Sequence, residues 1–126
     1  MTHADLRPRR SVLYMPAANE RALEKAKAIP ADALIFDLED AVAPDAKLLA
    51  REQVCAAVKG GGYGAREIVI RVNALETPWG TEDILAACDA EPDAILVPKV
   101  VHAATSLASP RSCKACMRRT RSGCGR

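Results

Sequence analysis

Short apolar runs alternate with helix-forming segments along the first hundred residues of the chain. The apolar runs predict strands at residues 11–16, 33–38, 67–73 and 94–98. The segments between them are rich in strong helix formers and predict helices at residues 20–28, 44–60 and 81–88. Apolar runs without polar alternation are typical of parallel strands that helices cover on both faces. The repeated strand–helix order therefore predicts an α/β fold with a parallel sheet.

Local signals set the ends of the first two helices. Asn19 is suited to cap the first helix, and Pro30 ends it. Pro44 and Asp45 favour the start of the second, because proline suits the first helical position and an acid suits the positive helix end. The glycine run at 60–62 stops that helix.

Polar side chains stand at or just past the carboxyl end of each predicted strand. They are Asn19, Asp37, Glu39, Asp40, Arg71, Asn73 and Lys99. Ligands bind at this edge in both (β/α)8 barrels and doubly wound sheets. Charges also collect wherever a strand leaves the core. Two interpretations stay open here, a ligand-facing rim and a set of solvated strand ends.

Length and composition narrow the class of protein. The chain has 126 residues, of which 49% are hydrophobic, which suits one globular domain. No stretch approaches the ~20 apolar residues of a membrane-spanning helix. Residues 1–10 do not resemble a secretory signal. We expect a cytoplasmic protein that makes no membrane contact.

The net charge of +2 conceals a break in composition near residue 100. All 16 acidic residues lie before that point, together with 12 of the 18 Lys and Arg residues. The remaining six basic residues follow it without any acid. We therefore divide the chain into a domain segment, residues 1–100, and a basic, cysteine-rich tail, residues 101–126.

Three carboxylates lie within four residues at the end of the second predicted strand. Asp37 and Glu39 are expected on one strand face, while Asp40 begins the loop. Clustered acids suit a hard cation such as Mg2+, or acid–base chemistry if one pKa is raised by its neighbours. The alternative is a helix-capping pair beside a solvated loop.

Arg71 stands at the end of a buried strand, where a guanidinium is costly unless it is paired. Its planar fork matches a carboxylate in two-point contact. Arg71 could therefore pair with Asp37 or Glu39 inside the protein, or hold a carboxylate of the substrate.

Arg21 and Lys25 lie four residues apart on the first predicted helix, after an amide-bearing helix start. A phosphorylated ligand could bind there, since helix N-termini favour anions. The chain has no GxGxxG or GxxxxGK[ST] motif, which argues against an ordinary nucleotide site. From spacing alone, a solvated basic face is the simpler interpretation.

Four motifs together resemble a known enzyme family. They are Arg10-Ser-Val-Leu-Tyr-Met-Pro-Ala-Ala-Asn19, Leu34-Ile-Phe-Asp-Leu-Glu-Asp-Ala-Val42, Val69-Ile-Arg-Val-Asn73 with Thr77-Pro-Trp-Gly80, and Ile95-Leu-Val-Pro-Lys-Val100. In this order and spacing, over residues 7–100, they resemble the amino-terminal third of the citrate lyase β-subunit-like CoA-ester lyases. These enzymes belong to the HpcH/HpaI aldolase superfamily.

The resemblance implies a (β/α)8 barrel, of which this chain holds the first four βα units. It also implies a lyase that cleaves or forms C–C bonds in acyl-CoA substrates of the citryl-CoA or malyl-CoA type, releasing acetyl-CoA and a keto acid. Mg2+ would serve as a Lewis acid. Intact members assemble as trimers or hexamers.

Individual residues take roles from the same resemblance. Arg71 becomes the catalytic residue that holds the keto-acid carboxylate or carbonyl. Tyr14, Arg21 and Lys25 match positions that contact CoA, although relatives have a lysine where Arg21 stands here. By the same resemblance, Asp37, Glu39 and Asp40 would lie around the metal site without binding the metal directly.

The chain also departs from the family pattern. The two Mg2+ ligands of the family, a Glu and an Asp, lie beyond the Pro-Lys-Val motif, and this chain has no acid after Asp93. A (β/α)8 barrel takes ~250 residues. We therefore expect an incomplete enzyme that is inactive alone. The alternative is a non-catalytic fragment that binds CoA or joins other subunits.

The tail has no apolar periodicity and no aromatic residue, and three interpretations remain for it. The favoured one is translation in a shifted reading frame, because a GC-rich gene read out of frame yields Arg, Ser, Cys, Gly and Pro. The second is a zinc site formed by Cys113, Cys116, Cys124 and His102. The third is a basic arm for nucleic acid or an acidic partner. We expect no specific nucleic-acid binding, since no aromatic residues stand between the basic ones.

Overall fold

The computed structural model describes residues 8–100 of the chain. The predictions for the tail, including the zinc-site and basic-arm interpretations, concern residues outside this range. The elements follow in the order β1 (Val12–Pro16), α1 (Glu20–Ala26), β2 (Ala33–Asp37), the 3-10 turn η2 (Pro44–Ala46), α2 (Lys47–Gly60), β3 (Glu67–Arg71), α3 (Gly80–Ala90) and β4 (Ala94–Leu96). Strand and helix alternate throughout, as the sequence predicts.

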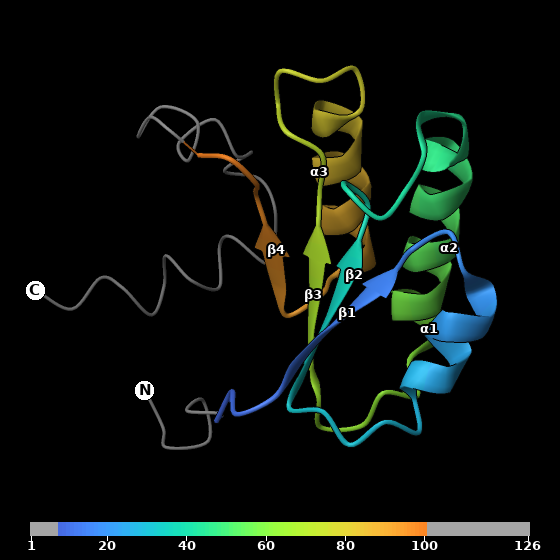
Figure 1. Cartoon of the computed structure of the whole chain (residues 1–126), viewed down its shortest axis with the longest axis vertical. Helices are drawn as coiled ribbons and strands as arrows, with labels where there is room; N and C mark the ends of the chain where they lie inside the picture. Colours follow the sequence, from blue (N-terminus) through green and yellow to red (C-terminus); the bar gives the residue numbers. More distant parts are fainter. Residues whose placement is uncertain (1–7, 101–126) are drawn as a thin grey trace, which may run out of the picture.

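The four strands form one parallel sheet in the order β1-β2-β3-β4 (Figure 1). At its carboxyl edge the register places Pro16 beside Asp37, Asp37 beside Arg71, and Arg71 beside Leu96. Strand ends that are far apart in the sequence therefore lie side by side at this edge.

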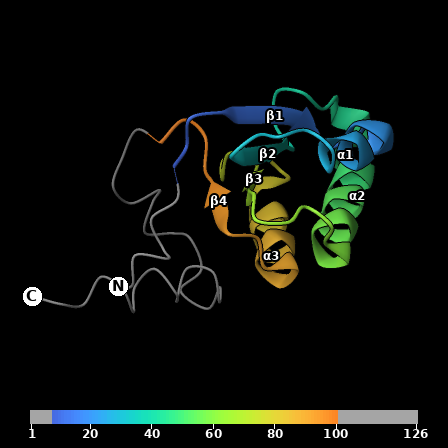
Figure 2. The ribbon, with the colours of Figure 1, turned by 90° about the horizontal axis from the view of Figure 1, so that it is seen from below.

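All three helices lie on the same face of the sheet (Figure 2). The expectation that helices cover both faces is wrong for the described residues. Strands in chain order require every crossover to run in the same direction, and right-handed crossovers then place each helix on the same side. This arrangement is that of a (β/α)8 barrel, since a doubly wound sheet has helices on both faces.

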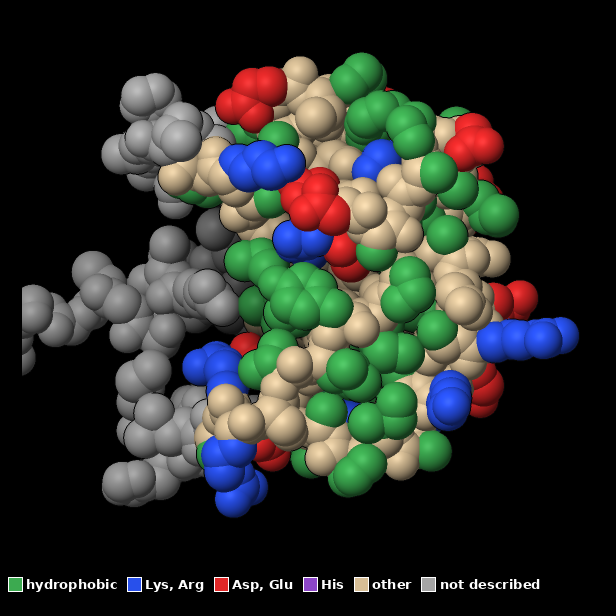
Figure 3. Space-filling view, in the orientation of Figure 1, with side chains coloured by type: hydrophobic (Ala, Val, Ile, Leu, Met, Phe, Trp, Pro, Cys, Tyr) green, Lys and Arg blue, Asp and Glu red, His purple; other side chains and the backbone are tan. Residues whose placement is uncertain are grey.

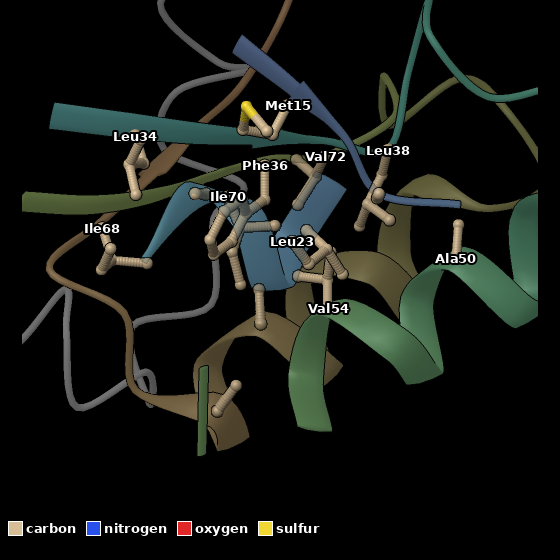
Figure 4. Close-up of a cluster of buried hydrophobic side chains, with 14 of the residues drawn as sticks. Met15, Leu23, Leu34, Phe36, Leu38, Ala50, Val54, Ile68, Ile70 and Val72 are labelled. Atoms are coloured by element: carbon tan, nitrogen blue, oxygen red, sulfur yellow. The ribbon is translucent and has the colours of Figure 1, made fainter. Parts of the chain in front are cut away.

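The core lies between the sheet and the helices. Figure 4 shows strand side chains such as Phe36 and Ile70 directed toward Leu23 of α1 and Val54 of α2. Phe36 is fully buried, and its ring meets that of Tyr63 edge to face at a centroid distance of 5.3 Å. This core holds the strands in register and so fixes the positions of their ends.

Strand β1 differs from its prediction as a buried strand. Met15 is buried against the helices, while Val12 and Tyr14 on the other face are 46% and 50% exposed. Only one face of β1 packs against helices, because all the helices lie on that side. Tyr14 is therefore left at the helix-free face of the sheet.

The predicted helix ends agree with the structure to within a few residues. The Asn19 side chain accepts a hydrogen bond from the Ala22 N–H and caps α1, as expected. Helix α1 ends at Ala26, ahead of Pro30. Pro44 opens a 3-10 turn that leads into α2, which ends at the glycine run.

Candidate active site

An ion pair between Asp37 and Arg71 lies at the centre of the carboxyl edge. The register places these residues opposite each other at the ends of β2 and β3. Arg71 Nε donates to Asp37 Oδ1 at 2.8 Å, and Arg71 Nη2 donates to Asp37 Oδ2 at 2.7 Å. The side chains are 18% and 4% exposed. The hydrogen bond to Asp37 raises the pKa of Arg71, so the guanidinium stays charged.

Asp37 also shapes the loop that follows β2. Its carboxylate accepts hydrogen bonds from the Glu39 N–H at 2.8 Å and the Ala41 N–H at 3.2 Å. Burial acts to raise the pKa of Asp37, but the hydrogen bonds from Arg71 and from these amides outweigh it and lower the pKa. Strand β2 ends at Asp37, so the expectation that Glu39 shares its strand face is wrong. The loop turns there because its amides bond to the Asp37 carboxylate.

Asp37 occupies only one edge of the Arg71 guanidinium. The edge formed by Nε and Nη2 is paired, while Nη1 lies 3.7 Å from Glu39 Oε1 and Nη2 lies 3.4 Å from Asp40 Oδ2. The Tyr14 ring stacks near the same group, with its centroid 5.1 Å from Arg71 Cζ. Apart from the bond of Nη2 to Asp37, the end of the guanidinium that carries Nη1 and Nη2 therefore makes only long contacts, and a ligand carboxylate could replace them.

Glu39 lies between two cations. Its carboxylate is 3.7 Å from Arg71 Nη1 and 3.8 Å from the Nζ of Lys99, which follows β4, and Glu39 is only 8% exposed. Lys99 has a positive φ of 52°, an uncommon conformation for a residue with a side chain. Acidic and basic side chains meet on the upper part of the surface, toward which the strands point (Figure 3). The predicted gathering of polar strand ends is thus found for β2, β3 and β4.

A buried polar network lies below this edge. Of its residues, only Asn73 was predicted from the sequence. Lys47 at the start of α2 is 6% exposed, and its ammonium reaches the Asn73 side chain at 2.8 Å. Asn73 Nδ2 donates to Asp83 at 2.6 Å, and Asp83 accepts a further bond from Arg51 Nε at 2.7 Å. Lys47 and Arg51 look like ordinary solvated positions of an amphipathic helix, and Asp83 looks like an acid of a first helical turn. No local signal distinguishes them.

The two basic residues of α1 stand beside the edge. Arg21 lines a 560 Å3 hollow together with Pro16, Asn19 and Ala41. Lys25 is exposed one turn further along the helix. Asn19 caps the helix, so its side chain has a structural role at the start of α1.

Residues 8–100 do not form a metal site by themselves. Within that range, no group of three or more His, Cys, Asp or Glu side chains is arranged to hold a metal ion. Glu39 and Asp40 offer carboxylate oxygens but are joined by cations rather than by further acids. The described donor set therefore does not fit Mg2+ as a complete coordination sphere. In the same range, no helix is both long and apolar enough to cross a membrane.

Known proteins with similar sequences include a malyl-CoA thioesterase, a citrate lyase subunit and a malyl-CoA lyase. The chain is 53% identical over 97 residues to a (3S)-malyl-CoA thioesterase of Cereibacter sphaeroides, covering 77% of this chain and 34% of that protein. It is 42% identical over 93 residues to the citrate lyase subunit beta of Escherichia coli, covering 74% and 31%. An L-malyl-CoA/beta-methylmalyl-CoA lyase of Cereibacter sphaeroides is 38% identical over 101 residues, covering 78% and 32%. The chain spans about a third of the length of these relatives.

Solved structures and a family sequence model agree with these matches. The citrate lyase beta subunit of Mycobacterium tuberculosis superimposes with a TM-score of 0.67 at 29% identity, covering 88% of this chain and 47% of that one. A CitE structure from the same organism, in complex with magnesium, acetoacetate and coenzyme A, gives a TM-score of 0.64 at 29% identity, covering 80% and 38%. The sequence model of HpcH/HpaI aldolase/citrate lyase matches residues 10–126. The chain therefore belongs to the HpcH/HpaI aldolase/citrate lyase family.

Proposed function

We propose that this chain carries the keto-acid-binding part of a lyase that acts on C–C bonds of acyl-CoA substrates. Arg71 is the catalytic residue and binds the carboxylate of the keto acid through Nη1 and Nη2. The observation that carries the proposal is the division of the guanidinium, in which Asp37 takes one edge and the other edge makes only long contacts. The internal pair and the ligand contact, alternatives in the sequence, can therefore coexist on one side chain.

The pair with Asp37 prepares Arg71 for this role. A free arginine has several rotamers and loses that freedom when it binds a ligand. Arg71 is already fixed by two short hydrogen bonds and by the Tyr14 ring. Binding then requires only the displacement of the 3.4 and 3.7 Å contacts to Asp40 and Glu39.

The remaining predicted residues are assigned around this anchor. Arg21 and Lys25 would contact the phosphates of CoA, and the position of Arg21 in the wall of the hollow beside β1 supports this. Tyr14 would contact the CoA portion from the helix-free face. A CitE relative was solved with magnesium and coenzyme A, and another with oxaloacetate and magnesium. In an intact enzyme Mg2+ would act as a Lewis acid, with Asp37, Glu39 and Asp40 in its surroundings rather than as its ligands.

The reaction itself has two candidates. A lyase would split malyl-CoA into acetyl-CoA and glyoxylate, whereas a thioesterase would add water and release malate and CoA. The relative with 53% identity is a (3S)-malyl-CoA thioesterase, which favours hydrolysis as the second candidate. Because the chain spans about a third of its relatives, we expect neither product from the chain alone. A fragment that binds CoA or joins other subunits is the non-catalytic alternative.

A binding experiment tests the proposal. The purified chain is titrated calorimetrically with oxaloacetate in the presence of MgCl2, as are Arg71→Lys and the control Arg66→Lys. Arg66 is also a partly buried arginine, but it donates to the carbonyl oxygens of Ile29 and Tyr63, away from the carboxyl edge. We expect Arg71→Lys to weaken binding at least about tenfold, the value of one lost charged contact, and Arg66→Lys to change nothing. Absence of binding to the wild type, or equal binding by all three, would reject the assignment.

Incubation with malyl-CoA and citryl-CoA then addresses catalysis. Separation of acetyl-CoA, free CoA, malate and keto acid distinguishes C–C cleavage from hydrolysis. Turnover at rates typical of enzymes by the chain alone would contradict the expected inactivity. Titration with CoA alone checks the non-catalytic alternative, which requires heat of binding without products.

A further inference from the structure

A buried ammonium group lies directly under the loop that carries Glu39. Lys47 Nζ donates to the main-chain oxygens of Leu38 at 2.9 Å and Glu39 at 2.7 Å, and to Asn73 Oδ1 at 2.8 Å. These three acceptors match the three protons of an ammonium group. None of them is a carboxylate, so the cation is held by neutral oxygens.

The acceptors are themselves fixed by a wider network. Asn73 Nδ2 donates to Leu38 O at 3.0 Å and to Asp83 Oδ2 at 2.6 Å. Asp83, which is 1% exposed, also accepts from the Asn73 N–H at 3.0 Å and from Arg51 Nε at 2.7 Å. Among the described residues, no buried side-chain nitrogen or oxygen lacks a hydrogen-bond partner. A polar network that is fully satisfied in this way is rigid.

Burying the charge of Lys47 in this network costs free energy, and that cost needs an explanation. Burial lowers the pKa of Lys47, although the charges of Asp83 and Asp37 act in the opposite direction. A well-packed apolar side chain would avoid the cost of burying the charge. Stability alone therefore does not account for a lysine at this position, and its contacts indicate another use.

Those contacts fix Glu39 from one side while Asp37 fixes it from the other. The Glu39 N–H donates to Asp37 Oδ1 at 2.8 Å, and the Glu39 carbonyl accepts from Lys47 at 2.7 Å. The peptide groups on both sides of Glu39 are thus held. Its carboxylate is consequently aimed at Arg71 Nη1 and Lys99 Nζ.

We propose that Lys47 is a positioning residue, which holds the main chain of Glu39 so that its carboxylate faces the open edge of Arg71. The inference rests on the proposed function, because that edge is where the keto acid binds. Lys47 touches no ligand itself. Its effect passes through the loop of residues 38–41, which also contains Asp40.

Three variants of helix α2 separate positioning from a general loss of stability. Lys47→Met keeps an unbranched side chain, one atom shorter than lysine, and removes all three donors. Val54→Ala creates a cavity at a fully buried position of the same helix and loosens the fold without removing any of the three Lys47 hydrogen bonds. Lys59→Met removes an exposed lysine that pairs with Asp89. Each full-length chain is studied by amide hydrogen exchange and by titration with oxaloacetate and MgCl2.

In Lys47→Met we expect the Glu39 and Ala41 amides to exchange at least about tenfold faster than in Val54→Ala, since local opening then no longer requires breaking the Lys47 bonds. Oxaloacetate binding should weaken by about tenfold or more in Lys47→Met. In Val54→Ala and Lys59→Met it should stay within about twofold. Lys47→Gln, whose polar head is one atom shorter, replaces Lys47→Met if that variant does not fold, with the same direction of change.

The two readouts keep this inference apart from the proposed function. If the wild type binds no oxaloacetate, the proposed function fails, and amide exchange alone decides the role of Lys47. If Glu39 and Ala41 exchange equally fast in Lys47→Met and Val54→Ala, the positioning role is overturned whatever the affinity. Unchanged oxaloacetate affinity in a folded Lys47→Met chain overturns it as well.

Discussion

Replacing Arg71 with alanine should cost folding free energy in addition to ligand binding. The substitution leaves Asp37, whose side chain is 4% exposed, without its cation. Removing one partner of a buried ion pair costs about 3–5 kcal/mol. Asp37 keeps its hydrogen bonds from the Glu39 and Ala41 amides, so we expect the lower end, about 3 kcal/mol. That is a large share of the ~5–15 kcal/mol that stabilises a typical domain.

A second substitution shows whether the unpaired charge causes the loss. Asp37→Asn removes the carboxylate charge while keeping the shape of the side chain. If the uncompensated charge dominates, the double variant Arg71→Ala, Asp37→Asn should lose less free energy of unfolding than the two single variants lose together. The difference should be about 2 kcal/mol, within the range for residues in direct contact.

Urea unfolding measures these free energies. Trp79 is the single tryptophan of the chain, and the centroid of its ring lies 5.3 Å from Lys47 Nζ. Its fluorescence therefore reports on the surroundings of Lys47. Arg21→Ala is the matched control, because Arg21 is an exposed arginine and should change stability by less than about 0.5 kcal/mol. A loss below about 1 kcal/mol for Arg71→Ala, or strict additivity in the double variant, would refute the reasoning.

Three further predictions concern other parts of the fold. A Cβ at Gly80 would lie 2.2 Å from the Ala74 carbonyl oxygen, so Gly80→Ala should lower the thermal midpoint by roughly 4–8 °C or more, and an unchanged melting curve would contradict the close approach. The lowered pKa of Asp37 contributes stability that is present above about pH 4 and lost as the pH falls through its folded value. Urea midpoints between pH 6 and 3 should therefore fall more steeply for the wild type than for Asp37→Asn, and parallel profiles would reject this. Burial raises the pKa of the Cys55 thiol, so alkylation of its peptide at pH 8, followed by mass spectrometry, should be slower than that of free cysteine.

The sequence was a good guide wherever the physical signal is local. Apolar runs and the helix-start signals at Asn19 and Pro44 predicted the elements, because short-range packing and backbone preferences determine them. The carboxyl-edge cluster followed from the same pattern, since parallel strands end together. The register then showed that Asp37 and Arg71 are direct neighbours, which no spacing along the chain reveals.

The sequence was a poor guide where a residue depends on distant partners. Lys47 is buried because the ends of β2 and β3 converge over it, and Asp83 because Asn73 and Arg51 meet it from two other elements. Nothing adjacent in the chain distinguishes either from a surface charge. The exposure of Tyr14 likewise depends on which face of the sheet the helices cover, and this follows from topology rather than from residue order.

The strand order has a consequence for the synthesis of the protein on the ribosome. Among residues 8–100, each strand after β1 pairs with the strand made immediately before it, so none of β2, β3 and β4 must wait for a later strand to find a neighbour. Domains commonly begin to fold from the amino terminus as the chain emerges. All three strand pairings are available once Leu96 has left the exit tunnel. The sheet can therefore grow one strand at a time, in the direction of translation.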